Sequence, residues 1–332
     1  MVIKLTERKS HILHLVIKEY IKNGNPVSSK LLCEKYKPGY SSATIRNDLA
    51  TLEKKGYLTH PYTSAGRIPT DEGYRYYIKD LMEIQRLTHE EERRIKNEFN
   101  NQMIELDKVM HQTSKMLAMV SECSGFTMAP NLTESLVEYI ELTKIGTNKL
   151  LVLMVTEEGL VKHRIIQCSE DLTQIKIKQI SKIINKRLHG KKISEVKKNI
   201  LNILETEKYE QELIFNIAQD LTNELFNLVD ENNFFFEESP NFLGNVDIDE
   251  ETYELVKQKE VMHNILENVK NTKQGVKILI GNDSPLKNCS LITSAYKLGE
   301  NSVGVLGIIG PKRMKYSKMV SLVDYISKMF DK

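Results

Sequence analysis

The sequence has no long apolar run, no paired cysteine motif and no phosphate-binding glycine loop. Of its 332 residues, 28% are charged and 40% are hydrophobic, which is ordinary for a globular protein. No apolar stretch approaches the ~20 residues that a helix needs to cross a bilayer. The basic N-terminus leads into an amphipathic pattern, which is not typical of a signal peptide. We therefore expect a cytoplasmic protein that makes no membrane contact.

Cysteine is scarce, and its spacing excludes the usual cysteine-based sites. The four residues lie far apart and form no CxxC pair: Cys33, Cys123, Cys168 and Cys289. A disulfide framework or a structural zinc site needs closer or paired thiols. We expect buried or half-buried reduced thiols, and neither a metal nor a cofactor.

Motifs typical of enzymes are also missing. Gly304, Gly307 and Gly310 are spaced by threes, but they form no GxGxxG turn and no Walker lysine accompanies them. The eight histidines are scattered, and none adjoins a serine or cysteine nucleophile motif. The sequence therefore predicts a protein that is not an enzyme.

The net charge of +2 is unevenly distributed along the chain. Residues 1–80 hold 14 basic and 8 acidic side chains, whereas the remainder holds 33 basic and 37 acidic side chains. A basic first part joined to a mildly acidic body favours nucleic-acid binding by the first part alone.

Residues 41–56 have the pattern of a short, capped helix. Ser41 or Ser42 can cap its first turn, and Ile45, Leu49 and Leu52 form one apolar stripe. Gly56 can take the left-handed turn that ends a helix. The opposite face is small, polar or basic, and such a helix can enter a major groove and contact base edges. The candidate DNA-binding residues of this recognition helix are Ser42, Ala43, Thr44, Arg46, Asn47, Thr51 and Lys54.

The residues that follow predict a wing, which is a hairpin beside the recognition helix. Residues 57–59 suit a strand, a turn follows, and Ile68 and Pro69 begin the return. We place Arg67 at the tip, where it can reach phosphate or the minor groove. Thr63, Ser64 and Arg67 are the candidate DNA-binding residues of the wing. The alternative is an ordinary helix and hairpin with a solvated charged rim.

Two earlier amphipathic helices complete a winged helix-turn-helix plan within the first 80 residues. The stretch that ends this part, Gly73-Tyr74-Arg75-Tyr76-Tyr77, mixes aromatic rings with a cation. These rings could stack on nucleic acid, but duplex readers rarely need such platforms. We favour the alternative that they seal the wing against the next element.

The two runs SSATIRNDLATLEKKGYL and TSAGRIPTDEGYRYYI, which span residues 41–78, resemble the signature of the heat-inducible transcription repressor HrcA family. One position departs from it, since Tyr62 stands where the family usually has histidine. Three later runs extend the resemblance, namely GVKILIG, SLITSAYKLGE and GVLGIIGPKRMKY, within residues 275–316.

The body alternates between helical and strand-like segments. One long helix is predicted over residues 89–121, with an apolar seam from Ile95 to Val120 that either packs on a sheet or forms a dimer. Strand patterns follow over residues 136–143, 149–156 and 160–167. Residues 172–204 and 209–228 have helical period and predict an insertion. A helix at 250–270, strands at 276–280, 291–296 and 302–309, and a terminal helix complete the chain.

Together these patterns predict a multidomain α+β protein. The resemblance implies a winged helix-turn-helix domain followed by a GAF-like α/β sheet domain that is interrupted by a helical dimerisation domain. We divide the chain into a winged helix at 1–80, the first part of the GAF-like domain at 81–170, the insertion at 171–233 and the second part of the GAF-like domain at 234–332.

The function that follows is transcriptional repression by a homodimer, each winged helix contacting one half-site of an inverted repeat in double-stranded DNA. The resemblance implies that the target is a CIRCE-type operator ahead of heat-shock (chaperone) operons, and that a GroEL-type chaperonin keeps the repressor active until heat stress diverts it. The alternative is a metabolite-sensing regulator with an effector pocket in the GAF-like domain. Two surfaces compete for the dimer contact, the inserted helices and the seam from Ile95 to Val120.

Overall fold

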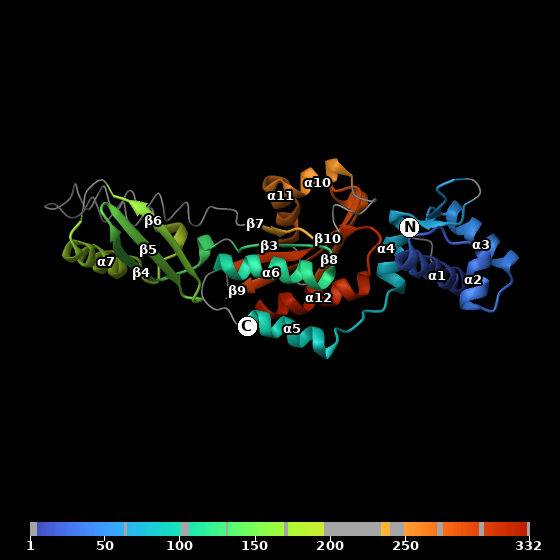
Figure 1. Ribbon diagram of the computed structural model, residues 1–332, viewed down its shortest axis with the longest axis horizontal. Coiled ribbons are helices and arrows are strands. Elements are labelled where there is room, and N and C mark those ends of the chain that lie inside the picture. The colour runs from blue at the N-terminus through green and yellow to red at the C-terminus, as the bar shows by residue number, and fades with distance from the viewer. Residues whose placement is uncertain are drawn as a thin grey trace.

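The computed structural model shows an elongated chain with a mainly helical N-terminal head at one end, a sheet body in the middle and a smaller sheet unit at the other end (Figure 1). It describes residues 5–62, 65–100, 106–130, 132–168, 172–195, 234–239, 249–270, 275–298 and 302–330. No helix within these ranges is long and apolar enough to cross a membrane.

The head is a winged helix built from α1 (Glu7–Asn23), α2 (Ser29–Tyr36), α3 (Ser42–Lys54), β1 (Leu58–Thr59) and β2 (Ile68–Pro69). Helix α3 begins and ends where the sequence predicts. Ser28 Oγ accepts the N–H of Leu31 at the start of α2, and Ser41 Oγ accepts the N–H of Thr44 at the start of α3. Gly56 follows α3 with a φ of +80°, a conformation that glycine adopts without a steric penalty.

The prediction of a single long helix over residues 89–121 is wrong. The head continues through α4 (Asp71–Tyr76) and a π-helical turn (Tyr77–Leu81), after which α5 (His89–Asn100) and α6 (Leu106–Ser121) form two separate helices. Arg94 Nη2 lies 4.0 Å from Met119 Sδ, so the two helices pack side by side. The seam packs inside the chain, because Ile95, Met110 and Leu117 are all fully buried.

The body is a five-stranded antiparallel sheet with helices on both faces, which is the GAF-like arrangement. The strand order is β7-β3-β10-β9-β8, and the bounds are β3 (Ser124–Met128), β7 (Phe234–Glu237), β8 (Val276–Ile280), β9 (Cys289–Leu298) and β10 (Ser302–Pro311). Helices α6 and α12 (Tyr316–Phe330) cover one face, whereas α10 (Glu250–Lys257) and α11 (Lys259–Lys270) cover the other (Figure 1). The predicted helix at 250–270 is thus divided at Gln258, whose backbone is extended.

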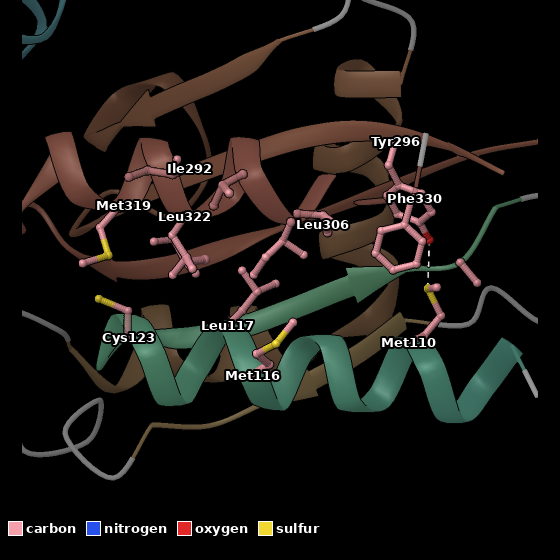
Figure 2. Close-up of a cluster of buried hydrophobic side chains, with 14 of the residues drawn as sticks. Met110, Met116, Leu117, Cys123, Ile292, Tyr296, Leu306, Met319, Leu322 and Phe330 are labelled. Atoms are coloured by element: carbon pink, nitrogen blue, oxygen red, sulfur yellow. Dashed lines mark hydrogen bonds between the residues drawn. The ribbon is translucent and has the colours of Figure 1, made fainter. Parts of the chain in front are cut away.

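Alternation along β10 supplies both layers of the core. Leu306 and Ile308 belong to the layer under α6 and α12, whereas Val305 and Ile309 belong to the layer under α10 and α11. This is the two-residue period of a strand that is buried on both faces. Figure 2 shows the first layer, where Tyr296 donates its hydroxyl hydrogen to Met110 Sδ at 2.8 Å.

The three strand-like segments between residues 136 and 167 do not join this sheet. Strands β4 (Val137–Gly146), β5 (Lys149–Thr156) and β6 (Val161–Gln167) form a separate three-stranded antiparallel sheet, with α7 (Gln174–Leu188) on one face. Asn185 and Ser181 of α7 both bond to the carbonyl of Ile140 in β4, at 2.6 Å and 3.2 Å.

The grouping of residues 81–170 into one sheet domain is therefore wrong. The smaller unit begins after β3, and the chain re-enters the large sheet at β7, which pairs with β3. An alternating pattern shows that a strand is half-buried but not which sheet it joins. The described part of the insertion thus contains strands as well as a helix, and the predicted helix at 209–228 lies outside the described residues.

Candidate nucleic-acid interface

Helix α3 presents the face that the sequence predicts. Its apolar stripe is buried, with Ile45 and Leu52 fully covered and Leu49 only 5% exposed. The candidate residues lie on the other side: Ser42, Ala43, Arg46, Asn47 and Lys54 are exposed, while Thr44 and Thr51 are half-buried. Thr51 donates its hydroxyl hydrogen to the backbone carbonyl of Asn47 at 2.9 Å. This bond does not involve the side-chain amide of Asn47.

Both carboxylates of α3 are paired with cations of the head. Asp48 is 3% exposed and accepts two hydrogen bonds from the guanidinium of Arg8 on α1, at 2.8 Å and 3.2 Å. Glu53 pairs with Arg67 and with His60. Burial alone would raise the pKa of Glu53, but hydrogen bonds from His60 and Arg67 outweigh it and lower the pKa. The outer face of the helix is therefore left with its cations, which suits a polyanionic ligand.

The placement of Arg67 at the tip of the wing is wrong. Its backbone forms a bridge with Val27, with both N–H···O distances at 2.8 Å, which puts it at the end of the wing loop, directly before β2. Its Nε donates to Glu53 at 2.9 Å, and its side chain is only 24% exposed. Thr63 and Ser64 lie outside the described residues. Arg67 thus ties the wing to α3, because the Glu53 carboxylate binds the guanidinium that was expected to contact DNA.

A buried carboxylate, which the sequence reading did not single out, joins α1 to α2. Glu19 is 1% exposed and accepts hydrogen bonds from Lys35 at 2.7 Å, Tyr36 at 2.5 Å and Asn23. Burial alone would raise the pKa of Glu19, yet these three donors lower it. The signal was present, since Glu19 lies seven residues after Ile12 and three after Val16, which places it on the apolar face of the first helix.

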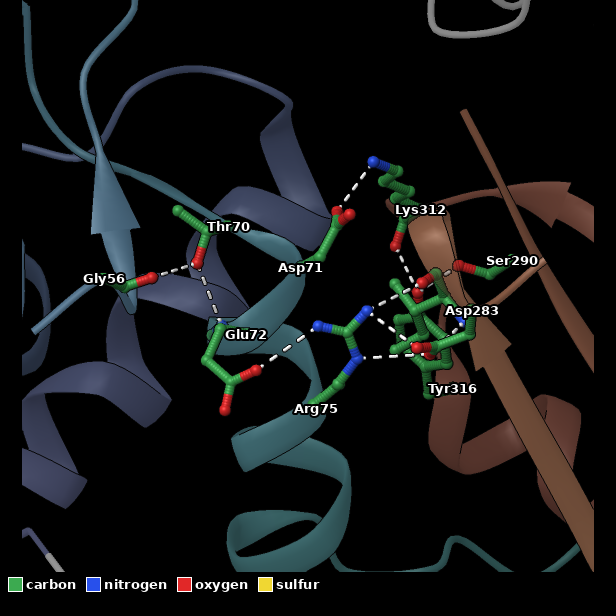
Figure 3. Close-up of polar contacts among 11 residues, drawn as sticks. Gly56, Thr70, Asp71, Glu72, Arg75, Asp283, Ser290, Lys312 and Tyr316 are labelled. Atoms are coloured by element: carbon green, nitrogen blue, oxygen red, sulfur yellow. Dashed lines mark hydrogen bonds and ion pairs between the residues drawn. The ribbon is translucent and has the colours of Figure 1, made fainter. Parts of the chain in front are cut away.

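The aromatic stretch after the wing seals the head onto the body, as favoured from the sequence. Tyr76 packs edge-on against Tyr57 with ring centroids 5.2 Å apart, and Tyr74 lies 5.8 Å from Tyr316 of α12. Arg75 belongs to the same junction, because its Nη2 donates to Asp283 at 2.9 Å and to the carbonyl of Ile280 at 3.1 Å (Figure 3).

A second ion pair crosses the same junction. Lys312, which follows β10, lies 2.7 Å from Asp71 at the start of α4 (Figure 3). Gly281 fits closely against this pair, because a Cβ at that position would lie 2.1 Å from Asp71 Oδ2. The head is thus fixed to the body by two ion pairs and by the contact between two buried tyrosines.

A small cavity opens beside this junction. Its volume is about 270 Å³, and its walls come from Ile21 on α1, the end of α6 and the loop before α12. Arg313, Lys315 and Lys318 contribute cations, and Glu122 contributes one carboxylate. Within the described ranges, no group of three or more histidine, cysteine, aspartate or glutamate side chains is placed to hold a metal ion.

A capped helix with a polar and basic outer face, a two-stranded wing beside it and a GAF-like body behind it define a winged-helix transcription regulator. Comparison with known proteins identifies its family. The family described as HrcA protein C terminal domain matches residues 107–320, and the DeoR-like helix-turn-helix domain matches residues 14–70. The chain belongs to the HrcA family of heat-inducible transcription repressors.

Individual relatives agree over nearly the whole length. The heat-inducible transcription repressor HrcA of Ruminiclostridium cellulolyticum is 34% identical over 335 residues, which cover 97% of this chain and 95% of the relative. That of Desulforamulus reducens is 32% identical and covers 98% and 96%. A crystal structure described as a hypothetical protein at 2.2 Å resolution shares the fold, with a TM-score of 0.72 at 24% identity over 99% and 98% of the two chains. The protein is a DNA-binding transcription repressor and not an enzyme.

Proposed function

We propose that the protein represses heat-shock operons in the cytoplasm by binding a CIRCE-type inverted repeat as a homodimer, with one recognition helix in each half-site. The observation that carries this proposal is the outer face of α3, where Arg46 and Asn47 are exposed while both carboxylates of the helix are paired elsewhere. A guanidinium and an amide can each form two hydrogen bonds with a base edge. Each such pair favours the correct base over a wrong one by ~1–3 kcal/mol.

The remaining candidate residues divide by role. Thr44 assists base contact, and Ala43 and Thr51 are small enough for close approach to the groove. Lys54 and Ser42, at the two ends of the helix, contact phosphates. Thr63 and Ser64 stay predicted phosphate contacts of the wing, and Arg67 holds the wing against α3 through Glu53.

The dimer forms through the smaller sheet unit. The face of its sheet that is turned away from α7 carries apolar side chains in the open, since Tyr139, Ile145 and Ile165 are 44%, 47% and 58% exposed. The half-buried residues Leu151 and Leu153 of the central strand lie between them. Exposed apolar patches of this kind mark interaction sites, whereas the competing seam on α5 and α6 is buried within the chain.

Chaperonin control is the second element of the proposal, and it rests on membership of the family. A GroEL-type chaperonin maintains the operator-binding form, and unfolded proteins compete for that chaperonin during heat stress. Repression then falls as the population of the operator-binding form falls.

The test is binding to a labelled inverted-repeat duplex and to a scrambled duplex of equal length, with and without purified chaperonin. We expect clear preference for the inverted repeat. Arg46→Ala should reduce this preference by about 5- to 150-fold, which follows from the ~1–3 kcal/mol of one lost base contact. Arg86→Ala is the matched control, because Arg86 is exposed in the segment between α4 and α5. Equal affinity for both duplexes under all conditions would disprove the proposal.

The cavity at the head–body junction favours a second candidate function, which is sensing of a small anionic metabolite. Its volume of about 270 Å³ is near the lower limit for small-molecule sites, and its cations outnumber its single carboxylate. Thermal unfolding in the presence of citrate, phosphate or chaperonin separates the two functions. Stabilisation by an anion that also changes operator affinity would favour the sensor, whereas an effect of chaperonin alone would favour the first proposal.

A further inference from the structure

Helix α7 carries a basic surface outside the winged-helix domain, so DNA binding by that domain does not account for it. Residues 172–194 contain seven lysines and arginines and no aspartate or glutamate, although residues 81–332 as a whole contain more acidic than basic side chains. The buried side of α7 includes Ile177, Ile180 and Ile184, which pack on the β4–β6 sheet. The basic side chains therefore gather on the side that faces away from this sheet.

Three of these lysines form a straight line. Lys178, Lys182 and Lys186 are four residues apart, so they lie on one side of the helix about 6 Å apart along its axis. We call them the α7 lysine stripe. All three are exposed, as are Lys176 and Lys191 beside them. Among the residues that the structure describes, none of the three forms an ion pair, whereas the nearby Lys192 is held by Glu134 at 2.6 Å.

The stripe works against the stability of its own helix. Like charges four residues apart repel one another, and Lys176 and Lys178 lie near the N-terminus, where the helix dipole disfavours cations. The N-terminal cap is Thr173, whose hydroxyl accepts the N–H of Lys176, and the first turn contains no acidic residue. A glutamate at one of these positions would stabilise the helix more than a lysine does. Binding of an external polyanion therefore explains the three lysines better than helix stability does.

We propose that the α7 lysine stripe is a second, sequence-independent DNA contact of this repressor. DNA is the polyanion that the protein binds, and flexible lysines can neutralise phosphates without reading bases. Helices α7 and α3 lie at opposite ends of the elongated chain (Figure 1). The stripe therefore contacts phosphates outside the half-site that is bound by its own head.

Salt dependence of binding gives a direct test. The triple variant K178Q/K182Q/K186Q keeps the side-chain length nearly unchanged and removes three charges. On a long duplex that carries the inverted repeat with ~20 base pairs on each side, the slope of log K against log salt should fall in magnitude by up to about 2.7 per chain, at ~0.9 for each phosphate contact. Between 50 and 200 mM salt, the wild type would then lose up to about fortyfold more affinity than the variant.

A minimal duplex with a single half-site serves as the internal control, and there the triple variant should bind as the wild type does. The matched variant K115Q/K259Q/K287Q removes three exposed lysines from α6, α11 and the turn before β9, and it should leave both slopes unchanged. Circular dichroism should show that α7 stays folded, because the substitution removes repulsion.

Three results would overturn the inference: an unchanged slope on the long duplex, an equal reduction in the matched variant, or equal loss on both duplexes. Loss of binding to purified chaperonin, with unchanged DNA slopes, would assign the stripe to a protein partner and would also overturn the inference. The failure of the proposed operator function would be visible separately, as a lack of preference for the inverted repeat in the wild type.

Discussion

Arg75 on the head and Asp283 on the body form a two-bond ion pair across 208 residues of sequence, with Nη2–Oδ1 at 2.9 Å and Nε–Oδ2 at 3.1 Å (Figure 3). Burial alone would raise the pKa of Asp283, but the hydrogen bond from Arg75 outweighs it and lowers the pKa. The pair therefore stabilises the junction at neutral pH, and this contribution is lost as the pH falls through the lowered pKa of Asp283.

A double-mutant cycle with Arg75→Gln and Asp283→Asn measures this pair. Both side chains are 34% exposed, so solvent screening limits the coupling free energy to about 1 kcal/mol. We expect that value from urea unfolding at pH 7, with a smaller value at pH 3. The exposed pair Lys328–Asp324 on α12 is the control, for which we expect about 0.3–0.5 kcal/mol. Equal coupling for the two pairs would show that the junction is not specially stabilised.

Glu19 provides a second pH-dependent contribution. Its folded pKa is lowered by Lys35, Tyr36 and Asn23, so it stabilises the head above the ordinary carboxyl pKa and less as the pH falls. Glu19→Gln should lower the free energy of unfolding by about 2–3 kcal/mol at pH 7, because it leaves buried donors with a weaker acceptor. The difference from the wild type should shrink between pH 5 and pH 3. A constant difference over that range would contradict a lowered pKa.

Glu53 links the recognition helix to the wing. Glu53→Gln should weaken its contacts with Arg67 and His60 and allow the wing to move relative to α3. Affinity for operator and scrambled duplex should then change by the same factor, while the preference between them is kept. A filter-binding or fluorescence-anisotropy titration measures both. A selective loss of operator binding would instead place Glu53 in base recognition.

A substitution at Gly73 tests the packing between α4 and the wing. A Cβ at this position would lie 2.2 Å from the carbonyl oxygen of Tyr57, which is backbone and cannot rotate away. Gly73→Ala should destabilise the head by about 1–3 kcal/mol. Gly146→Ala is the matched control, since its nearest neighbour would be Lys149 Cβ at an ordinary 3.8 Å. Similar melting temperatures for the two variants would show that the close approach is relieved without cost.

The proposed dimer surface can be tested with one charged substitution on each side of the smaller unit. Ile165→Lys places a cation on the exposed apolar face of the sheet and should shift sedimentation towards the monomer. Ile175→Lys adds the same charge on α7, where the side chain is 72% exposed, and should leave the dimer intact. Dissociation by Ile175→Lys alone would move the interface to α7.

The individual strands and the terminal helix of the body could be predicted from the sequence, but the sheet to which each strand belongs could not. The strand predicted at Val276–Ile280 and the terminal helix were confirmed, because period and turn residues are local signals. The membership of β4–β6 in a separate sheet was missed, since the alternation in their sequences is the same whichever partner strand covers them. The break between α5 and α6 was also missed, because the seam continues across it in sequence.

The sequence by itself determined the recognition helix, from its cap at Ser41 through its buried stripe to Gly56, because those interactions join residues within a few positions of one another. Only the tertiary structure decided what the charged residues around it do. Arg67 turns to Glu53 and Arg75 turns to Asp283, and neither choice is visible locally, since an ion pair depends on which distant segments the packing of apolar faces brings together. The same packing leaves Lys178, Lys182 and Lys186 without a partner among the described residues.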